Sequence, residues 1–368
     1  MKKITRYWKF IILYAILLLI LNILSRIPAF CDKYTDYVFP IWTNTYGRIT
    51  GVFPFSVGEV LIALAILAVF AAVIIGISLI FLRKRERKGY KLFAIRYLKG
   101  ILVAAMTTGL LYSLNCSMLY GCSKLVLNEK ADSDYTVSQI ETLRAYIINK
   151  CNALAKEFER DANGNIVSDL DKKKEIQKAM SGLSKEYPRF SGYISAPKPI
   201  LGSYFMYYTN MIGVYFPFSL EANYSIYLND ANFPYTACHE LAHMKGYIYE
   251  NEADYFAFLA CTGSEQPLLQ YSGYINVLHY LDDDYYSMVD LETYEQQVQI
   301  SDFVWQDMNC YTEETIEEVE SVNSFIDEEA VVKAGDAFTE TYLDYYGAEA
   351  NYSEVTKLVL RYYDGILY

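Results

Sequence analysis

Three long apolar stretches stand in the first third of the chain. They cover about residues 8–25, 57–82 and 101–119. The second, VGEVLIALAILAVFAAVIIGISLIFL, holds a single charged residue. A helix needs ~20 mostly apolar residues to cross the ~30 Å hydrocarbon layer of a membrane. The pattern therefore predicts three transmembrane helices within a membrane region of residues 1–120. The first stretch is too long for the core of a signal peptide and no small-residue cleavage site follows it, which favours an uncleaved anchor.

Basic residues predict the orientation of these helices. Four of them lie in the first nine residues, eight lie between the second and the third stretch, and only three lie between the first and the second. Cytoplasmic loops of membrane proteins are enriched in Lys and Arg. We therefore expect a multi-pass protein of the cytoplasmic membrane, with its N-terminus inside and residues 121–368 outside. The lipid bilayer is its first expected partner.

The rest of the chain has a mixed pattern. Apolar residues recur at helical spacing in two segments, a stretch rich in Tyr, Phe, Val and Ile predicts strands, and the composition then becomes helical again to the end. These segments are, in order, residues 137–161, 169–187, 205–228, 234–281 and the tail, whose acidic run 313–320 predicts a solvated helix face. The pattern is that of a mostly helical α+β domain with a small sheet.

Charge narrows the partners. The formal net charge is −12, and all but four of the 44 acidic residues follow residue 120. Nucleic acid needs a basic face, so it is excluded as a partner. Seven cysteines without a CxxC pair argue against a cysteine zinc site. Glu59, at the start of the second span, fits a capping box with Ser56 better than an ion pathway.

The residues that carry chemistry are concentrated in His239-Glu240-Leu241-Ala242-His243, which holds two of the three histidines. On a helix, residues four apart share a face, so both imidazoles can reach one metal ion. Glu240 then stands beside them as a general base for a metal-bound water. The spacing predicts a Zn²⁺ site, which in catalytic form takes three protein ligands and a water.

The third ligand is sought in the segment Glu250-Asn-Glu-Ala-Asp254. Glu250 and Glu252 lie about 200° apart on a helix, so only one of them can face the metal. We favour Glu252 because the small Ala253 beside it allows close approach. Glu250 and Asp254 share the other face and are the alternatives, as a ligand or as partners of a ligand histidine. Peptide hydrolysis also needs a hydrogen-bond donor to the oxyanion of the transition state. The candidates are His279, Tyr274 and Tyr280.

These motifs resemble a known family. The stretches PKPILGSYFMYYTNMIGVYFPFSLEANYSIYLND and FPYTACHELAHMKGYIYENEADYFAFLAC are similar to a bacterial membrane-protein family called domain of unknown function 3810. Its pattern has asparagine where this chain has Asp254. The resemblance implies a gluzincin-like zinc metallopeptidase with Glu252 as third ligand. The expected fold class is a membrane α-helical N-terminal region with three spans plus a zincin-like α+β outer domain, residues 121–368, whose small sheet precedes the metal helix.

Two functions remain open. The first is a membrane-anchored zinc peptidase that hydrolyses peptide bonds of peptides or proteins outside the cytoplasmic membrane. The second is a non-catalytic cell-surface binding or sensor module with a structural metal site, in which Glu240 has no role. For the peptidase, we expect an extended substrate to pair with an edge strand at residues 223–228.

Overall fold

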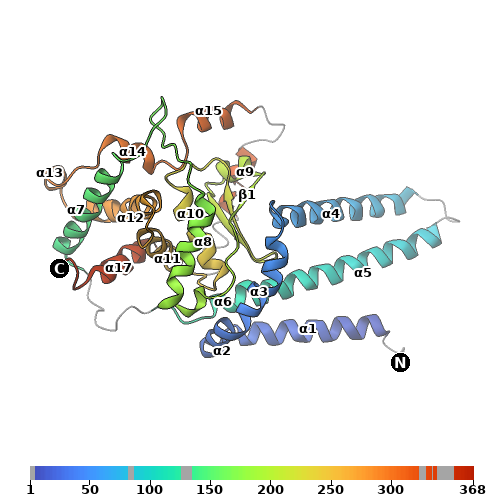
Figure 1. Ribbon diagram of the computed structural model, residues 1–368. Helices are drawn as coiled ribbons and strands as arrows, with labels where there is room; N and C mark the ends of the chain where they lie inside the picture. Colours follow the sequence, from blue (N-terminus) through green and yellow to red (C-terminus); the bar gives the residue numbers. More distant parts are fainter. Residues whose placement is uncertain (1–4, 82–86, 126–134, 323–328, 334, 338–351) are drawn as a thin grey trace.

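The computed structural model describes residues 5–81, 87–125, 135–322, 329–333, 335–337 and 352–368. Three helices in the first third are long and apolar enough to cross a membrane, as predicted. The first two are α1 (Arg6–Leu24) and α4 (Val57–Phe81), and the third runs from Lys88 to Tyr120. It is longer than predicted because α5 (Arg87–Tyr112) continues through the π-helical turn η2 (Ser113–Ser117) into α6 (Met118–Tyr120). In Figure 1 they project together from the rest of the molecule.

Short helices that the sequence pattern did not predict join the first two spans. They are α2 (Pro28–Lys33), η1 (Tyr34–Val38) and α3 (Phe39–Gly51), and Figure 1 shows α3 at the base of the projecting helices. Tyr34 and Phe39 are buried in the same hydrophobic core as residues from far beyond residue 120. The division of the chain at residue 120 stays a prediction, and the two sides share one core.

A three-stranded sheet follows. It consists of β1 (Lys198–Ile200), β2 (Gly213–Phe216) and β3 (Glu221–Ser225), in the order β1-β3-β2. β3 pairs in parallel with β1 and antiparallel with β2, so it is the central strand. The expectation of an edge strand at residues 223–228 is therefore wrong. The two edge strands of the sheet are β1 and β2. The start of the predicted strand region is instead the helix α9 (Ser203–Tyr208).

Helices form the remainder, as the sequence pattern predicted. α10 (Phe233–Met244) packs against β2 and β3 on one side and against α11 (Glu250–Thr262) on the other. α12 (Pro267–Met288) covers both helices. Around them lie α7 (Val137–Leu154), α8 (Lys172–Gly182), the short turns η3 (Leu183–Lys185) and η4 (Pro188–Phe190), α13 (Leu291–Glu295), α14 (Asp302–Met308), α15 (Glu313–Ser321) and α17 (Tyr352–Tyr363). α10 and α11 are almost wholly buried.

One buried carboxylate connects the sheet to the second membrane helix. Glu221, at the start of β3, accepts hydrogen bonds from the backbone N–H groups of Val57 (3.2 Å) and Gly58 (2.9 Å) in the first turn of α4. It also accepts from Ser219 Oγ at 2.6 Å and forms an ion pair with Lys198 of β1. A helix begins with unpaired N–H groups and a positive dipole end, and a carboxylate satisfies both. The sheet therefore caps α4.

A substitution at Lys198 should destabilise this junction. Lys198→Met leaves the Glu221 carboxylate buried without its counter-charge, which costs about 3–5 kcal/mol in comparable sites. The measurement is denaturant unfolding of the protein in mild detergent. Lys178→Met is the matched control because Lys178 pairs with Glu265 on the surface, where both side chains are exposed. Equal unfolding of the two variants would show that the buried pair does not hold the junction.

Candidate metal centre

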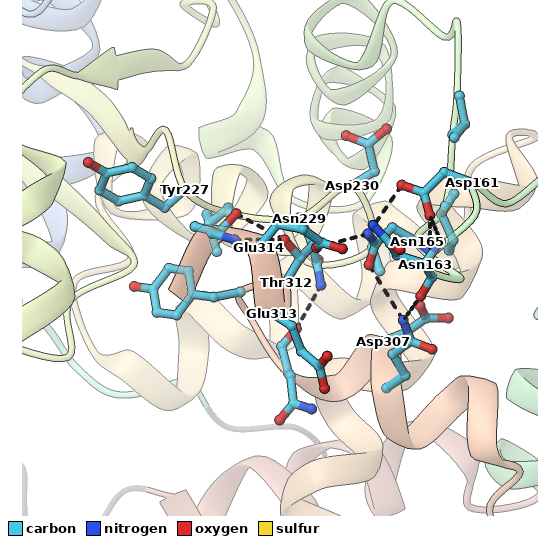
Figure 2. Close-up of a pocket in the computed structure, with 18 of the residues that line it drawn as sticks. Asp161, Asn163, Asn165, Tyr227, Asn229, Asp230, Asp307, Thr312, Glu313 and Glu314 are labelled. Atoms are coloured by element: carbon cyan, nitrogen blue, oxygen red, sulfur yellow. Dashed lines mark hydrogen bonds between the residues drawn. The ribbon is translucent and has the colours of Figure 1, made fainter. Parts of the chain in front are cut away.

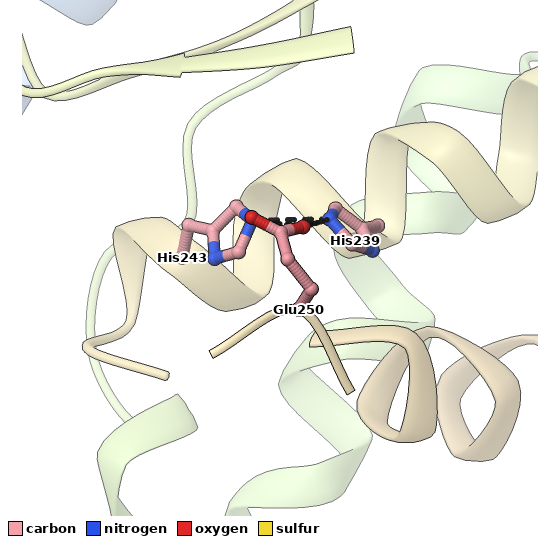
Figure 3. A group of neighbouring side chains, drawn as sticks. All are labelled: His239, His243 and Glu250. Atoms are coloured by element: carbon pink, nitrogen blue, oxygen red, sulfur yellow. Dashed lines mark hydrogen bonds and ion pairs between the residues drawn. The ribbon is translucent and has the colours of Figure 1, made fainter. Parts of the chain in front are cut away.

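Two histidines and a glutamate converge at the contact between α10 and α11. The Nε2 atoms of His239 and His243, one turn apart on α10, are 3.0 Å from each other. Glu250 Oε2, from the first turn of α11, lies 3.0 Å from His239 Nε2 and 3.6 Å from His243 Nε2 (Figure 3). Zinc bonds of ~2.0–2.1 Å at tetrahedral angles place ligand atoms about 3.3 Å apart. The three atoms thus have the spacing of a zinc ligand set.

The other nitrogen of each histidine determines its proton. His243 Nδ1 lies 2.8 Å from the carbonyl oxygen of Tyr247, and a carbonyl only accepts, so Nδ1 carries the hydrogen. His239 Nδ1 lies 2.7 Å from Asp254 Oδ1, and the same argument applies. In neutral imidazoles both Nε2 atoms are then lone-pair acceptors. They face each other and the Glu250 carboxylate, so three acceptors converge, and either an added proton or a bound metal ion satisfies them.

The carboxylates around His239 also favour a positive charge at this place. Removal from water by itself lowers the pKa of an imidazole, since it disfavours the charged form. Asp254 and Glu250 outweigh this effect and hold the pKa of His239 well above its ordinary value. The surrounding protein therefore favours a positive charge at this nitrogen pair.

A glycine makes this arrangement possible at the end of α10. Gly246 has a φ of +92°, which ends the helix in a left-handed turn, and Tyr247 N donates to Ala242 O at 3.2 Å. This turn brings the Tyr247 carbonyl back to His243. A side chain at Gly246 would also meet Thr35 Cγ2 at 2.5 Å. The glycine three residues after the motif is thus required by both conformation and space.

The third member of the cluster is Glu250, and Glu252 points elsewhere. Among the described residues, the group that could hold a metal consists of His239, His243 and Glu250. Glu252 is buried and its Oε1 accepts the backbone N–H of Leu125 at 2.6 Å. Burial raises the pKa of Glu252 to about 7. The structure thus brings Glu250 to the two histidines and not the preferred Glu252, because the two side chains leave α11 on opposite sides.

Of the other predicted residues, Asp254 contacts the cluster and three do not. Asp254 lies one turn after Glu250, and its Oδ1 is 2.7 Å from His239 Nδ1. This is the role of a partner to a histidine, which was one of the expected alternatives. His279 is exposed on α12, where its ring neighbours Tyr280. Tyr274 is buried against Phe258, away from the histidines. Tyr280 is half-buried beside the core. None of these three is placed in the His–His–Glu cluster.

Glu240 lies between the metal cluster and the sheet. It is buried, and the backbone N–H of Tyr215 in β2 donates to its carboxylate. A Cβ atom on Gly213 would lie 2.4 Å from Glu240 Oε1, so only glycine fits there. Burial raises the pKa of Glu240 to about 7, against the opposing effect of the two histidines. The sequence analysis missed Gly213 and Tyr215, although a glycine inside a strand often marks such a close approach.

A separate cavity of about 430 Å³ lies beyond the start of α10 (Figure 2). Its walls include Asp161, Asn165, Asp230 and Glu314. Asp161 Oδ1 accepts the N–H groups of Asn163 and Asn165, both at 2.9 Å, so the carboxylate closes its own turn. The segment is therefore a turn that its own first residue stabilises. The cavity does not include the histidine cluster.

Fold and site together define a mostly helical protein with three candidate membrane-spanning helices and a histidine–glutamate cluster suited to a metal ion. The family described as Protein of unknown function (DUF3810) matches residues 34–360, and the chain belongs to it. This confirms the family resemblance. No curated protein and no solved structure matches the chain.

Metal content should distinguish the two glutamates. We expect the purified protein to hold about one zinc ion per chain, and Glu250→Gln to weaken zinc binding because it removes a charged ligand. Glu252→Gln is the matched control, and it should retain the metal since Glu252 faces Leu125. Elemental analysis after dialysis against a chelator measures both. Loss of zinc from the Glu252 variant alone would restore the original assignment.

The partner of His239 generates another prediction. Asp254→Ala removes the acceptor that holds the ring, and we expect zinc affinity to fall ~10–100-fold, as for comparable partners of ligand histidines. Asp254→Asn keeps an acceptor oxygen at the same place and should retain most of the affinity. Competition with a chromophoric chelator measures the difference. Equal affinities for wild type and Asp254→Ala would show that Asp254 does not orient the ligand.

Proposed function

We propose that the protein is a membrane-anchored zinc peptidase that cleaves peptide bonds of peptide or protein substrates. The observation that carries this proposal is the convergence of three acceptor atoms, two imidazole nitrogens and a carboxylate oxygen, beside the buried carboxylate of Glu240. The order of elements supports a zincin-like fold of the gluzincin type. A small sheet precedes the metal helix α10, and α11 then supplies Glu250 as third ligand.

The residues of the chain divide the work of hydrolysis. His239, His243 and Glu250 hold the ion, and Asp254 and the Tyr247 carbonyl fix the imidazole rings. A bound Zn²⁺ supplies a Lewis acid that lowers the pKa of water toward ~7. Glu240 takes the proton from the attacking water as the new C–O bond forms at the peptide carbonyl. It then delivers that proton to the nitrogen as the C–N bond breaks, which yields a carboxylic acid and an amine.

The free edge of β2 suits an extended substrate. Ser225 N donates to Ile212 O, which fixes the phase of the antiparallel ladder between β2 and β3. Alternate residues of such a ladder bond to the partner strand, so Val214 and Phe216 face β3. Gly213 and Tyr215 then direct their main-chain groups to the outer edge of β2, where the Tyr215 N–H binds Glu240 and where no strand of the described residues pairs. A substrate strand that pairs there is held without demands on its side chains.

The side of the membrane follows from the loops. Residues 1–9 and 83–99 hold 12 of the 15 basic residues that precede residue 120. Under the positive-inside rule both lie in the cytoplasm, and the metal centre then lies outside the cytoplasmic membrane. We propose this orientation together with the enzymatic function.

A non-catalytic binding or sensor module is the weaker alternative. A structural metal site needs its ligands and the groups that orient them. It does not need Glu240, and burial of a carboxylate costs free energy unless ion pairs and hydrogen bonds compensate it. The glycine that leaves room for Glu240 in β2 is a second feature without a role in a structural site. Both features support the peptidase.

The role of Glu240 is testable by one substitution. Glu240→Gln keeps the shape of the side chain but cannot accept a proton, so peptide hydrolysis should fall ~10²–10⁴-fold. Zinc content should remain unchanged because Glu240 is not in the ligand set. The measurement is cleavage of a mixed peptide library by the full-length protein in detergent. The control Glu265→Gln alters an exposed carboxylate and should cleave like the wild type. Hydrolysis by Glu240→Gln at the wild-type rate would refute the mechanism.

A further inference from the structure

The strand β2 extends from the candidate catalytic site to the membrane helices. At its start, a Cβ on Gly213 would lie 2.4 Å from Glu240 Oε1. At its end, the ring of Phe216 packs against Gly58. A Cβ atom on Gly58 would lie 2.7 Å from Phe216 Cδ1. Gly58 is in the first turn of α4. The two ends are three residues apart, and a strand rises ~3.3 Å per residue, so about 10 Å of strand separates the residue at Glu240 from the residue at α4.

The third candidate span is attached to the same strand. Asn115 lies in η2, near the end of that span, and its side chain is buried. Its Nδ2 donates to Pro217 O at 2.8 Å, just after β2, and its carbonyl accepts from Tyr215 Oη at 3.1 Å. Two membrane helices therefore hold β2 by buried contacts. The strand cannot move away from the membrane without breaking them.

A third attachment lies on the other edge of the sheet. Glu59, in the first turn of α4, accepts the N–H groups of Leu201 (3.0 Å) and Gly202 (2.8 Å), in the turn between β1 and α9. The interpretation of Glu59 as a helix cap is thus incomplete. Ser56 Oγ does accept from Glu59 N, but the Glu59 carboxylate binds this turn.

Exposed apolar side chains surround this attachment, and we call them the membrane-proximal patch. The patch consists of Val52, Phe53, Phe55, Leu201 and Phe205, which are 79, 43, 44, 78 and 44% exposed. Exposed apolar groups that adjoin each other mark a surface covered by a partner. Val52, Phe53 and Phe55 lie within five residues of the start of α4, and Leu201 N binds Glu59 in its first turn. A bilayer that surrounds α4 would therefore also cover the patch, and the turn after β1 would rest on the lipid surface.

We infer that the substrates are membrane-attached polypeptides, cleaved within a few residues of the bilayer surface. This inference rests on the proposed peptidase function. A chain that pairs with β2 beside Glu240 lies along the line from Glu240 to α4, so one of its ends points to the bilayer. At ~3.3 Å per residue, the chain reaches the level of the first turn of α4 after about three to six residues. The geometry suits the segment that adjoins a membrane span of another protein, and it holds on either side of the membrane.

The test uses the full-length protein in liposomes. A randomised six-residue segment is attached to a model transmembrane helix of ~20 Leu and Ala residues. Uncharged spacers of 0, 4, 10 and 20 residues separate the two. The same segment without the helix is the free substrate, and Glu240→Gln is the inactive control. Mass spectrometry locates each cut relative to the span.

We expect cleavage with the four-residue spacer, with cuts about three to six residues from the span. The anchored substrate should be cleaved at least ~10-fold faster than the free one at equal concentration. Cleavage that needs a spacer of ten residues or more would overturn the inference, because it would place the site far above the bilayer. Equal cleavage of free and anchored substrates would also overturn it, and in both cases the peptidase function would survive. No cleavage of any substrate by the wild type would refute the peptidase function and the inference with it.

Discussion

The carboxylate of Glu221 is the interaction on which the arrangement of this molecule depends. It is buried where the central strand, the edge strand β1 and the second membrane helix meet. It accepts from two backbone N–H groups of α4, from Ser219 and from Lys198. A carboxylate is buried at tolerable cost only when such donors surround it. Because these donors come from different parts of the chain, the sheet and α4 have one fixed position relative to each other. The histidine cluster, which packs against the sheet through α10, is therefore held at a fixed distance from the start of α4.

The candidate metal centre shows how the groups around two histidines can matter as much as the histidines themselves. Two imidazoles four residues apart occur in many helices. Here their Nδ1 atoms are both engaged by acceptors, one from Asp254 and one from the Tyr247 carbonyl. This leaves both Nε2 lone pairs directed at one point, where Glu250 adds negative charge. The fixed proton positions, more than the sequence motif, make the cluster a site for a cation.

Local patterns predicted part of this structure. The three apolar helices follow from composition and length, and the helix that bears His239 and His243 follows from spacing. What the sequence could not predict depends on contacts between distant segments. Whether Glu250 or Glu252 faces α10 depends on where α11 begins and on Leu125, more than a hundred residues earlier, which binds Glu252. The strand order depends on β1, which takes the far edge of β3 and leaves β2 as the edge beside α10.

The short helices between the first two spans escaped prediction for a related reason. α2 and α3 have few turns and no long apolar face. They are ordered by burial of residues such as Tyr34 and Phe39 against the core of the later domain. The roles of Gly213 and Tyr215 were equally invisible, since only the packing of β2 on α10 brings them to Glu240. Pairing across long sequence separations is what a single sequence conveys least.

The cap that β3 provides for α4 also bears on how the protein is made. Glu221 follows Val57 by 164 residues, so the second span leaves the ribosome long before its cap exists. At synthesis rates of ~5–20 residues per second, that interval is roughly 8 to 33 seconds. During this time water at the membrane surface must serve the N–H groups that Glu221 later takes. Insertion of the span is thus completed by the folding of a domain that is still being synthesised, and a defect in the sheet would first become visible as an unfinished membrane helix.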